Sequence, residues 1–308
     1  MIVATTLPAL AKSPENFIYM SSGDLDSTSA LMERSDIGGV QIVYNWRSLE
    51  PQKNKYDFSQ IERDLSRIKA SNKKLFIQVQ DRFFEKNARH FPDYLMNEDS
   101  YDGGISPQFD NAGEGKPIGA GWVAQQWNSA VRQRYQALLA ALADHFDGEI
   151  YGVNIPETAI DLDMKKAPKG FSCDNYFAGE IENLAFARKV FKKSYVVQYV
   201  NFWPCEWNND HKYMSRLFEF AIANDIGLGG PDIIPYRKAQ MNNSYPFFNK
   251  YKNKISLVAM AVQEPTLTYI NPKTGKPFQK NEFVQFSEVY LGADIIFWST
   301  ASPWLNEK

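Results

Sequence analysis

The chain has 308 residues, a formal net charge of −2, 44% hydrophobic residues and 23% charged residues. These values are ordinary for a globular protein, and the chain has no excess of positive charge that would indicate a nucleic-acid partner. No apolar stretch approaches the roughly 18 residues that a membrane-spanning helix needs. The length suits one large α/β domain, since eight-fold barrels reach roughly 250 residues or more as a single unit.

The first segment, residues 1–15, is predicted to be an N-terminal arm or the remnant of a signal peptide. Residues 9–11, Ala-Leu-Ala, fit a small-residue cleavage pattern, but the segment lacks a basic start and its apolar part is short. A periplasmic or secreted location follows only if the segment is a signal remnant. Residues 16–308 are expected to form one domain.

Eight runs of residues are predicted to be strands. Several are rich in Val, Ile, Phe and Tyr and nearly continuous in apolar character, as expected for strands covered on both faces. In chain order the runs are 16–21, 39–46, 74–84, 150–155, 195–203, 226–235, 255–263 and 294–299.

Amphipathic helical patterns separate most of these strands. Ile61, Leu65 and Ile68, for instance, recur at helical spacing between charged residues. The patterns cover residues 58–71, 127–146, 176–191, 213–223 and 282–291. Alternating β and α segments predict parallel strands, and eight strands predict closure into a (β/α)8 TIM barrel, with an open sheet as the alternative.

One connection is too long for a simple loop. Residues 85–123 follow the third predicted strand and are rich in glycine. Long loops in compact domains are usually functional, so we expect a wall or lid of the cleft, with a variable surface insertion as the alternative. After the last predicted strand only residues 300–308 remain, too few for a full eighth helix. The closing end is therefore expected to be irregular, or the chain to be truncated there.

Two glutamates end predicted barrel strands. Glu157 follows the fourth strand and Glu264 ends the seventh run. Residues just past the C-terminal ends of barrel strands form the active site of this fold. Two facing carboxyl groups there are the catalytic groups that cleave a glycosidic bond. They lie roughly 5–5.5 Å apart in enzymes that retain the anomeric configuration. We predict Glu157 as acid/base and Glu264 as nucleophile; the alternative is that each caps a helix or pairs with a base.

Three local features make the chain resemble the clan A glycoside hydrolases, which are retaining β/α-barrel glycosidases. They are residues 38–51 with 55–58, the tripeptide 263–265, and the tryptophan in residues 295–299. In that group the acid/base ends strand four and the nucleophile ends strand seven. The resemblance therefore implies these roles for Glu157 and Glu264, and it implies a sugar platform for Trp298.

The chain departs from the clan pattern in one place. The clan usually has Asn directly before the acid/base, whereas here Asn154 stands three positions before Glu157. Asn154 remains the candidate ligand for a sugar hydroxyl. Asp161 and Asp163, a few residues further on, are fallback acids or exposed loop residues.

Other residues near strand ends are candidates for substrate binding or support. Arg47 is predicted to keep Glu264 ionised, because a nearby opposite charge lowers a carboxylate pKa, or else to form a surface ion pair. Gln80, Asp81 and Asp232 are candidates to bind sugar hydroxyls or to make structural hydrogen bonds. Tyr236 is a candidate to orient the nucleophile or to lie at the solvent edge.

Aromatic residues near strand ends fit a carbohydrate ligand, because their faces suit the C–H faces of sugar rings. We expect about half of them to line the cleft and the others to belong to the core. They are Trp46, Phe83, Phe84, Trp203, Trp207, Tyr236 and Trp298. Several aromatics suggest several subsites, so the expected substrate is a polysaccharide or oligosaccharide; a non-catalytic carbohydrate-binding barrel is the alternative.

The sequence predicts no metal and no cofactor. His90, His145 and His211 lack metal-ligand spacing, and two cysteines cannot complete a four-thiolate site. Cys173 and Cys205 follow the fourth and fifth strands, so their loops are expected to be neighbours. They either form a disulfide, which needs Cα atoms within about 7 Å, or remain two unrelated thiols.

Overall fold

Eight parallel strands form a closed barrel in this computed structural model, which describes residues 13–109 and 120–306. The strands are β1 (Glu15–Ser21), β2 (Ile37–Asn45), β3 (Lys74–Gln80), β7 (Gly152–Ile155), β8 (Tyr195–Tyr199), β9 (Gly227–Gly230), β10 (Val258–Val262) and β11 (Ile295–Ser299). The pairing of β1 with both β2 and β11 closes the barrel. The predicted (β/α)8 barrel is confirmed, and the open-sheet alternative is wrong. Most of the predicted N-terminal arm lies outside the described residues.

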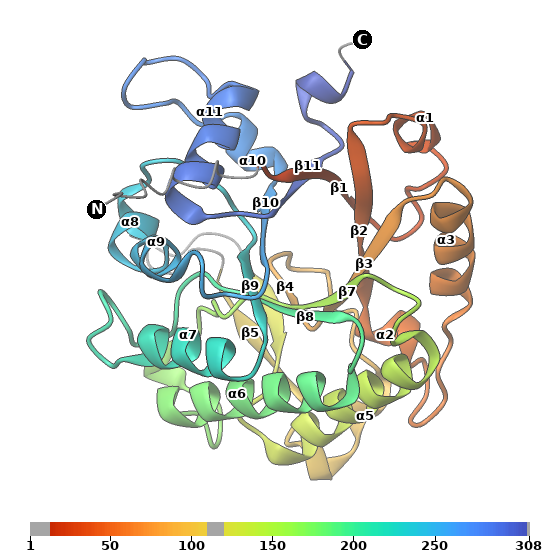
Figure 1. Cartoon of the computed structure of the whole chain (residues 1–308). Coiled ribbons are helices and arrows are strands. Elements are labelled where there is room, and N and C mark those ends of the chain that lie inside the picture. Colours follow the sequence, from red (N-terminus) through yellow and green to blue (C-terminus); the bar gives the residue numbers. More distant parts are fainter. Residues whose placement is uncertain (1–12, 110–119, 307–308) are drawn as a thin grey trace, which may run out of the picture.

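Helices surround the barrel in Figure 1. The predicted patterns correspond to α3 (Ser59–Ala70), α5 (Ser129–Phe146), α6 (Cys173–Val190), α7 (Tyr213–Ala223) and α11 (Lys280–Phe286), which continues as a π-helical turn at Ser287–Leu291. The sequence did not predict the short helices α1 (Ser29–Met32), α2 (Trp46–Leu49), α8 (Lys238–Asn242), α9 (Tyr245–Tyr251) and α10 (Glu264–Leu267).

Side chains cap the N-termini of the long helices. Asn128 accepts hydrogen bonds from the backbone N–H groups of residues 130 and 131 at the start of α5, and Ser172 accepts one from residue 175 in α6. Such caps satisfy backbone donors that have no partner inside the helix. They explain why α5 and α6 begin where they do.

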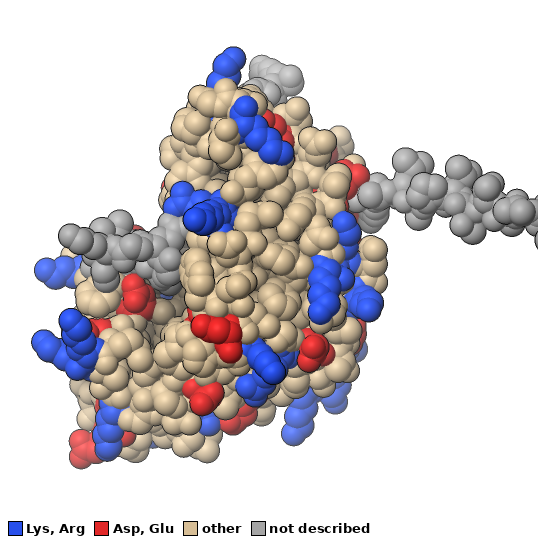
Figure 2. Space-filling model, turned by 90° about the vertical axis from the view of Figure 1, so that its left-hand side faces the viewer, with Lys and Arg blue, Asp and Glu red and all other residues tan. Residues whose placement is uncertain are grey.

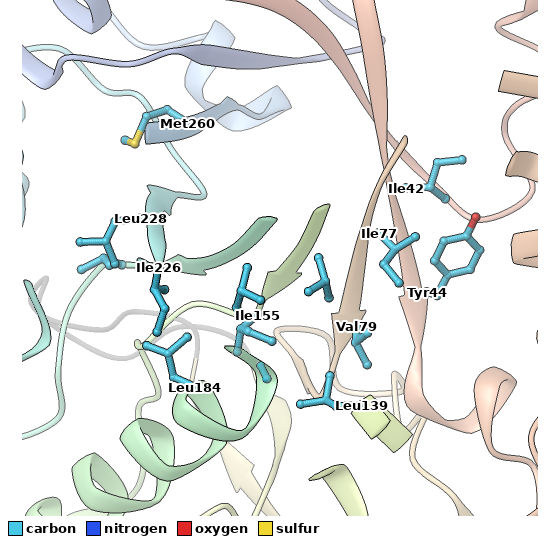
Figure 3. Packing of buried hydrophobic residues seen from close by; sticks show 14 of the residues in the cluster. Ile42, Tyr44, Ile77, Val79, Leu139, Ile155, Leu184, Ile226, Leu228 and Met260 are labelled. Atoms are coloured by element: carbon cyan, nitrogen blue, oxygen red, sulfur yellow. The ribbon is translucent and has the colours of Figure 1, made fainter. Parts of the chain in front are cut away.

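The barrel wall divides the hydrophobic core into two layers. Outside the wall, Ile77 and Val79 of β3 belong to the same packed cluster as Leu139 of α5, and Ile155 of β7 to the same cluster as Leu184 of α6 (Figure 3). A separate cluster fills the barrel interior; its members include Phe17, Phe76, Val197, Leu257 and Phe297. Alternate residues of each strand thus enter different layers, as strand geometry requires.

The long connection after β3 carries its own structure. It contains β4 (Arg82–Phe83), α4 (Asp93–Asn97), a 3-10 turn (Asp99–Tyr101), β5 (Ile105–Gln108) and β6 (Gly121–Ala124). The strands form a small antiparallel sheet in the order β4-β6-β5. The closing end is irregular, as expected, because β11 is followed by a 3-10 turn at Pro303–Leu305.

The surface carries no dominant charge on the face in Figure 2, where acidic and basic side chains are interspersed among other residues. This agrees with the net charge of −2. Among the helices within residues 13–109 and 120–306, none has both the length and the apolar character of a membrane span.

Candidate active site

Three carboxylates follow barrel strands at the same offset. Glu157 lies two positions beyond the end of β7, Asp232 two beyond β9, and Glu264 two beyond β10, where it begins α10. Because the barrel strands are all parallel, the three residues lie at one end of the barrel. This is the end at which enzymes of this fold carry their active sites.

A cavity of about 330 Å³ opens at this end of the barrel. It is near the lower limit of roughly 300–1,000 Å³ for small-molecule sites. Its lining comes from strand ends and from the connection after β3: Tyr19, Gln78, Gln80, Phe83, Phe84, Glu85, Ala88, His90, Glu157, Tyr199, Pro231 and Gln263. The connection after β3 thus supplies one wall of the cavity, as predicted.

Tyr19 lies among the three carboxylates. It faces the barrel interior from β1, where it is in register with Ser299 of β11. Burial, together with the charges of Asp232, Glu264 and Glu157, raises the pKa of Tyr19 to about 12. Its hydroxyl therefore stays neutral at ordinary pH, when it can donate a hydrogen bond to a carboxylate. The sequence analysis missed Tyr19, because it considered residues at strand ends and Tyr19 lies within a strand.

Glu157 is held by an amide and a guanidinium. Asn201 donates from Nδ2 to Glu157 Oε2 at 2.9 Å, and Arg82 donates from Nη1 to the backbone carbonyl of Glu157. Arg82 is buried and forms ion pairs with Asp81 and Glu180. These contacts fix both the backbone and the carboxylate of Glu157, which lines the cavity.

Glu264 and Asp232 differ in exposure. Glu264 is exposed, and its Oε1 accepts a hydrogen bond from Ser299 Oγ at 3.3 Å. Burial raises the pKa of Asp232 to about 6, although Thr266 Oγ1 donates to its Oδ1 at 3.2 Å and opposes the shift. The chain thus offers one solvated carboxylate and one carboxyl that binds a proton near pH 6.

A layer of amides forms the floor of the cavity. Tyr199 donates from its hydroxyl to Gln41 Oε1 at 3.0 Å, Gln41 donates to Gln78 Oε1 at 3.1 Å, and Gln78 donates to Gln80 Oε1 at 2.7 Å. Asn154 is in register with Gln78 and fully buried, and both of its side-chain polar atoms lack a partner among the described residues. A buried unpaired polar group costs about 1–3 kcal/mol. Asn154 does not line the cavity, so its role in binding a ligand hydroxyl stays a prediction.

Of three predicted support residues, two lie away from the cavity and one lines it. Arg47 forms an ion pair with Asp93 and donates to the carbonyl of Phe91 at 2.7 Å. This corrects the expectation that Arg47 keeps Glu264 ionised. Asp81 is buried against Arg82 and serves the structure, whereas Gln80 lines the cavity.

Two predicted tryptophans are fully buried. Trp46 donates to Glu50 Oε2 at 3.0 Å, and Trp298 donates to Asn16 Oδ1 at 2.9 Å. Ser299, next to Trp298, holds Glu264, so Trp298 points to the opposite side of β11 and packs against Phe283 of α11. Neither tryptophan is accessible to a sugar, which corrects their prediction as substrate-binding residues.

Of the remaining predicted aromatics, Phe83 and Phe84 line the cavity, whereas Tyr236, Trp203 and Trp207 lie beside other hollows. Tyr236 is exposed, packs on Phe286, and has Lys273 Nζ 3.7 Å from its ring centroid. The charge of Glu264 raises the pKa of Tyr19, so Tyr19 replaces Tyr236 as the tyrosine near the nucleophile candidate. Trp203 is buried and lines a second cavity with Trp207. Asn201, which the sequence analysis also missed, lay inside the predicted run 195–203, but the strand ends at Tyr199.

The cysteines are joined. Cys173 of α6 and Cys205 in the loop after β8 form a disulfide with Cα atoms 6.2 Å apart. Of the two alternatives that the sequence left open, the bridge is the one present. Within residues 13–109 and 120–306, His, Cys, Asp and Glu form no group of three that could hold a metal ion.

Comparisons with solved structures find the same fold in glycoside hydrolases. The catalytic domain of a β-amylase from Paenibacillus polymyxa matches with a TM-score of 0.57 and 10% identity, over 94% of this chain and 93% of that chain. A family 39 glycoside hydrolase from Bacteroides cellulosilyticus matches with a TM-score of 0.54 and 10% identity, over 93% and 56%. Xylanase A of P. fluorescens subsp. cellulosa, in complex with xylopentaose, matches with 0.54 and 13%, over 98% and 92%.

No protein-family model matches the chain. No curated protein matches its sequence either. TM-scores of 0.54–0.57 establish the shared barrel fold, whereas at identities of 10–13% the chemistry must be argued from this chain's own residues.

Proposed function

We propose that this protein is a glycoside hydrolase that cleaves a polysaccharide or oligosaccharide by a retaining mechanism. Glu157 acts as acid/base and Glu264 as nucleophile. The observation that carries the proposal is the placement of both carboxylates at the same offset beyond β7 and β10, within electrostatic reach of Tyr19, beside a cavity that Glu157 and Gln263 line. Glycosidic cleavage needs such a pair of carboxyl groups on opposite sides of the scissile bond.

The mechanism assigns one task to each group. Protonated Glu157 gives its proton to the glycosidic oxygen while Glu264 attacks the anomeric carbon, so the leaving alcohol departs and a glycosyl ester forms. Glu157, now ionised, takes a proton from water, which attacks the same carbon and releases Glu264. Asn201 holds the Glu157 carboxylate for both proton transfers. Ser299 holds Glu264, Tyr19 lies within electrostatic reach of both carboxylates and can donate to one of them, and Gln78 and Gln80 bind hydroxyls of the sugar in the cavity.

Exposure supports this division of roles. Glu264 is exposed and accepts one hydrogen bond from Ser299, so its carboxylate is oriented and can be reached by a substrate. Glu157 is part buried at the cavity wall, which suits a group that must hold a proton. The three solved structures named above are also glycoside hydrolases, which raises the prior for this chemistry on this barrel.

A substrate screen with product stereochemistry tests the proposal. Wild-type protein is incubated with a panel of polysaccharides, and released reducing ends are measured. The first anomer formed from the best substrate is then followed by proton NMR. We expect turnover and a product with the anomeric configuration of the substrate; inversion of configuration would contradict the assignment of Glu264 as nucleophile.

The same screen addresses the non-catalytic alternative. Asn154 is a buried hydroxyl-binding candidate that would serve a binding protein equally well. Tight glycan binding without turnover across the panel would favour a carbohydrate-binding barrel.

A further inference from the structure

A second cavity, of about 220 Å³, lies between the loops that follow β7 and β8. Its lining is Ile160, Asp161, Leu162, Met164, Phe202, Trp203, Pro204, Cys205, Glu206 and Trp207. None of these lining residues is a lysine or an arginine. The lining instead combines aromatic faces, an indole N–H and carboxylates, which are groups that bind uncharged hydroxylated molecules.

Two stacked aromatic rings, one exposed and one buried, form one side of this cavity. Trp207 is 41% exposed, and its ring is parallel to that of Phe202, with 6° between the planes and 6.1 Å between the centroids. Phe202 is buried and therefore supports Trp207 from the protein side. A rigid, exposed indole face at the edge of a hollow provides the flat apolar surface on which a sugar ring can stack.

Polar groups of both kinds line the same cavity. Trp203 is 3% exposed, and its Nε1–H has no partner among the described residues. Burying such a donor unpaired costs about 1–3 kcal/mol, so a ligand oxygen at this position would gain a hydrogen bond. Asp161 is half-buried and supplies an acceptor, whereas the carboxylate of Glu206 is already occupied by the backbone N–H groups of Tyr213 and Met214.

The cavity is held rigidly in place. The Cys173–Cys205 disulfide ties the loop after β8 to α6, and Glu206 ties the same loop to the N-terminus of α7. The backbone N–H of Trp207 also donates to Asp210 Oδ1 at 3.0 Å. A preorganised loop loses little conformational freedom when it binds a ligand, and this favours affinity.

The cavity adjoins the proposed acid/base. Asn201, whose side chain donates to Glu157, directly precedes Phe202 in the chain. Phe202 also packs in one cluster with Ala159, two positions after Glu157. An acid/base protonates the oxygen of the departing group, so the departing part of a substrate lies on its side of the bond.

We propose that the cavity at Trp207 is a binding subsite for an uncharged sugar residue in the departing part of the substrate, so that the enzyme acts on chains extending past the cleaved bond. This inference rests on the proposed function. It identifies the substrate class as neutral oligosaccharides or polysaccharides bound on both sides of the bond. The exposed Trp207 thus serves the departing end, while Gln78 and Gln80 serve the sugar that becomes attached to Glu264.

The test compares long substrates with short ones. We use xylohexaose, cellohexaose and maltohexaose together with the glycosyl fluorides of their sugars, whose departing fluoride leaves the cavity empty. Trp207→Ala is expected to lower kcat/KM on the best hexasaccharide about 10-fold, through KM, because one stacking contact is lost. The value on the glycosyl fluoride should remain within about 2-fold of wild type. Ile270→Ala, which truncates another exposed side chain on a different loop, should change neither value.

Two further measurements separate the possible failures. Cys173→Ser/Cys205→Ser should reproduce the selective loss on the hexasaccharide, because it frees the loop that carries Trp207. Equal losses on long and short substrates, or no loss on either, would overturn the subsite. Calorimetric titration of the hexasaccharides into Glu264→Gln and Glu264→Gln/Trp207→Ala gives a readout that does not need turnover. If the wild-type protein hydrolyses none of the substrates and hexasaccharide binding still depends on Trp207, the sugar site is retained and the proposed enzymatic activity is refuted. If no hexasaccharide binds, or if binding is the same with and without Trp207, the subsite is refuted.

Discussion

The interior of the barrel has two layers of side chains with different chemistry, although the same strands build both. In the aromatic layer, Phe17, Phe76 and Phe297 pack edge to face, with ring centroids 5.3–6.1 Å apart. Two residues further along each of these strands stand Tyr19, Gln78 and Ser299, which face the cavity or hold Glu264. Successive residues alternate between strand faces, so a step of two keeps the side chain inside the barrel and changes only its layer.

The comparison separates stability from function along a single strand. The aromatic layer is excluded from solvent and contributes through burial, about 1.5–3 kcal/mol for each large side chain. The polar layer contains the unpaired Asn154 and the carboxyl of Asp232, both of which oppose folding. Substitutions in the aromatic layer should therefore lower the free energy of unfolding more than the activity of the folded molecules. Substitutions in the polar layer should lower the activity more than the free energy of unfolding.

The largest effect is expected for Glu264→Gln. Loss of the nucleophile should lower kcat on the best glycan about 10⁴-fold or more, as the loss of a catalytic nucleophile does in other enzymes. Because Glu264 is exposed, the free energy of unfolding should change by no more than about 0.5 kcal/mol. Initial rates and urea denaturation measure the two quantities. Glu62→Gln, at an exposed position on α3, is the matched control, and a Glu264→Gln protein with wild-type rates would refute the assignment.

Phe76→Ala should act on the other layer. Removing this buried ring leaves a cavity in the barrel interior, so the free energy of unfolding should fall by about 3–5 kcal/mol. Urea denaturation measures the loss, and kcat per folded molecule should stay within a few-fold of wild type. Gln78→Ala, two residues further on the same strand, is the companion variant: it should cost less stability, about 1–3 kcal/mol from the partners left unpaired, and should raise KM. The opposite pattern would contradict the separation of layers.

Tyr19→Phe tests the polar layer with one atom. Hydrogen bonds to charged groups contribute about 1.5–3 kcal/mol, so loss of the hydroxyl should lower kcat roughly 10- to 100-fold. Since the pKa of Tyr19 is raised to about 12, the pH–rate profile below pH 9 should keep its shape. Tyr290→Phe, on the outer helical layer, is the control. A shifted alkaline limb in Tyr19→Phe would show that the hydroxyl titrates, contrary to this expectation.

The smallest effect concerns Asp232→Asn and pH. The pKa of Asp232 is raised in the folded protein to about 6, so the folded state binds a proton more tightly than the unfolded state. Its contribution to stability is therefore fully present below the ordinary Asp pKa and is lost as the pH rises to about 6. Above that pH, Asp232→Asn should be more stable than wild type by about 1–2 kcal/mol, allowing for the solvent that reaches the half-buried carboxyl. Denaturation at pH 4 and pH 7.5 should show the difference only at the higher pH.

Periodicity predicted the barrel because each of the eight apolar runs contains a strand. Runs such as 150–155 and 255–263 are covered by helices on one side and by the barrel interior on the other, so both faces are apolar and the strands are readily recognised. The positions of Glu157 and Glu264 just beyond their strands could also be predicted. The ends of the strands were harder to predict: the run 195–203 continued past Tyr199 because apolar residues of the following loop are also buried.

The sequence did not show which side chains point into the barrel interior, and this limited the prediction of the site. Phe297, Trp298 and Ser299 are all apolar or small, and only the register with β1 shows that Trp298 is on the outer face. Tyr19 could have been found by the same alternation, since it follows Phe17 by two positions on an interior face. Arg47 finds its partner in Asp93, which belongs to the connection after β3. Contacts of that kind depend on tertiary structure and leave no local pattern in the sequence.

The seam between β1 and β11 has a consequence for biosynthesis. Tyr19 and Ser299 are neighbours across this seam although nearly the whole chain separates them. Contacts between such distant residues form late, because the entropy of closing so long a loop must first be overcome. A nascent chain on the ribosome therefore already contains Glu157 and Glu264 while Ser299 has yet to be synthesised. The proposed catalytic site is completed only when β11 docks, so premature termination or proteolysis before β11 should yield a protein without the proposed activity rather than one with reduced activity.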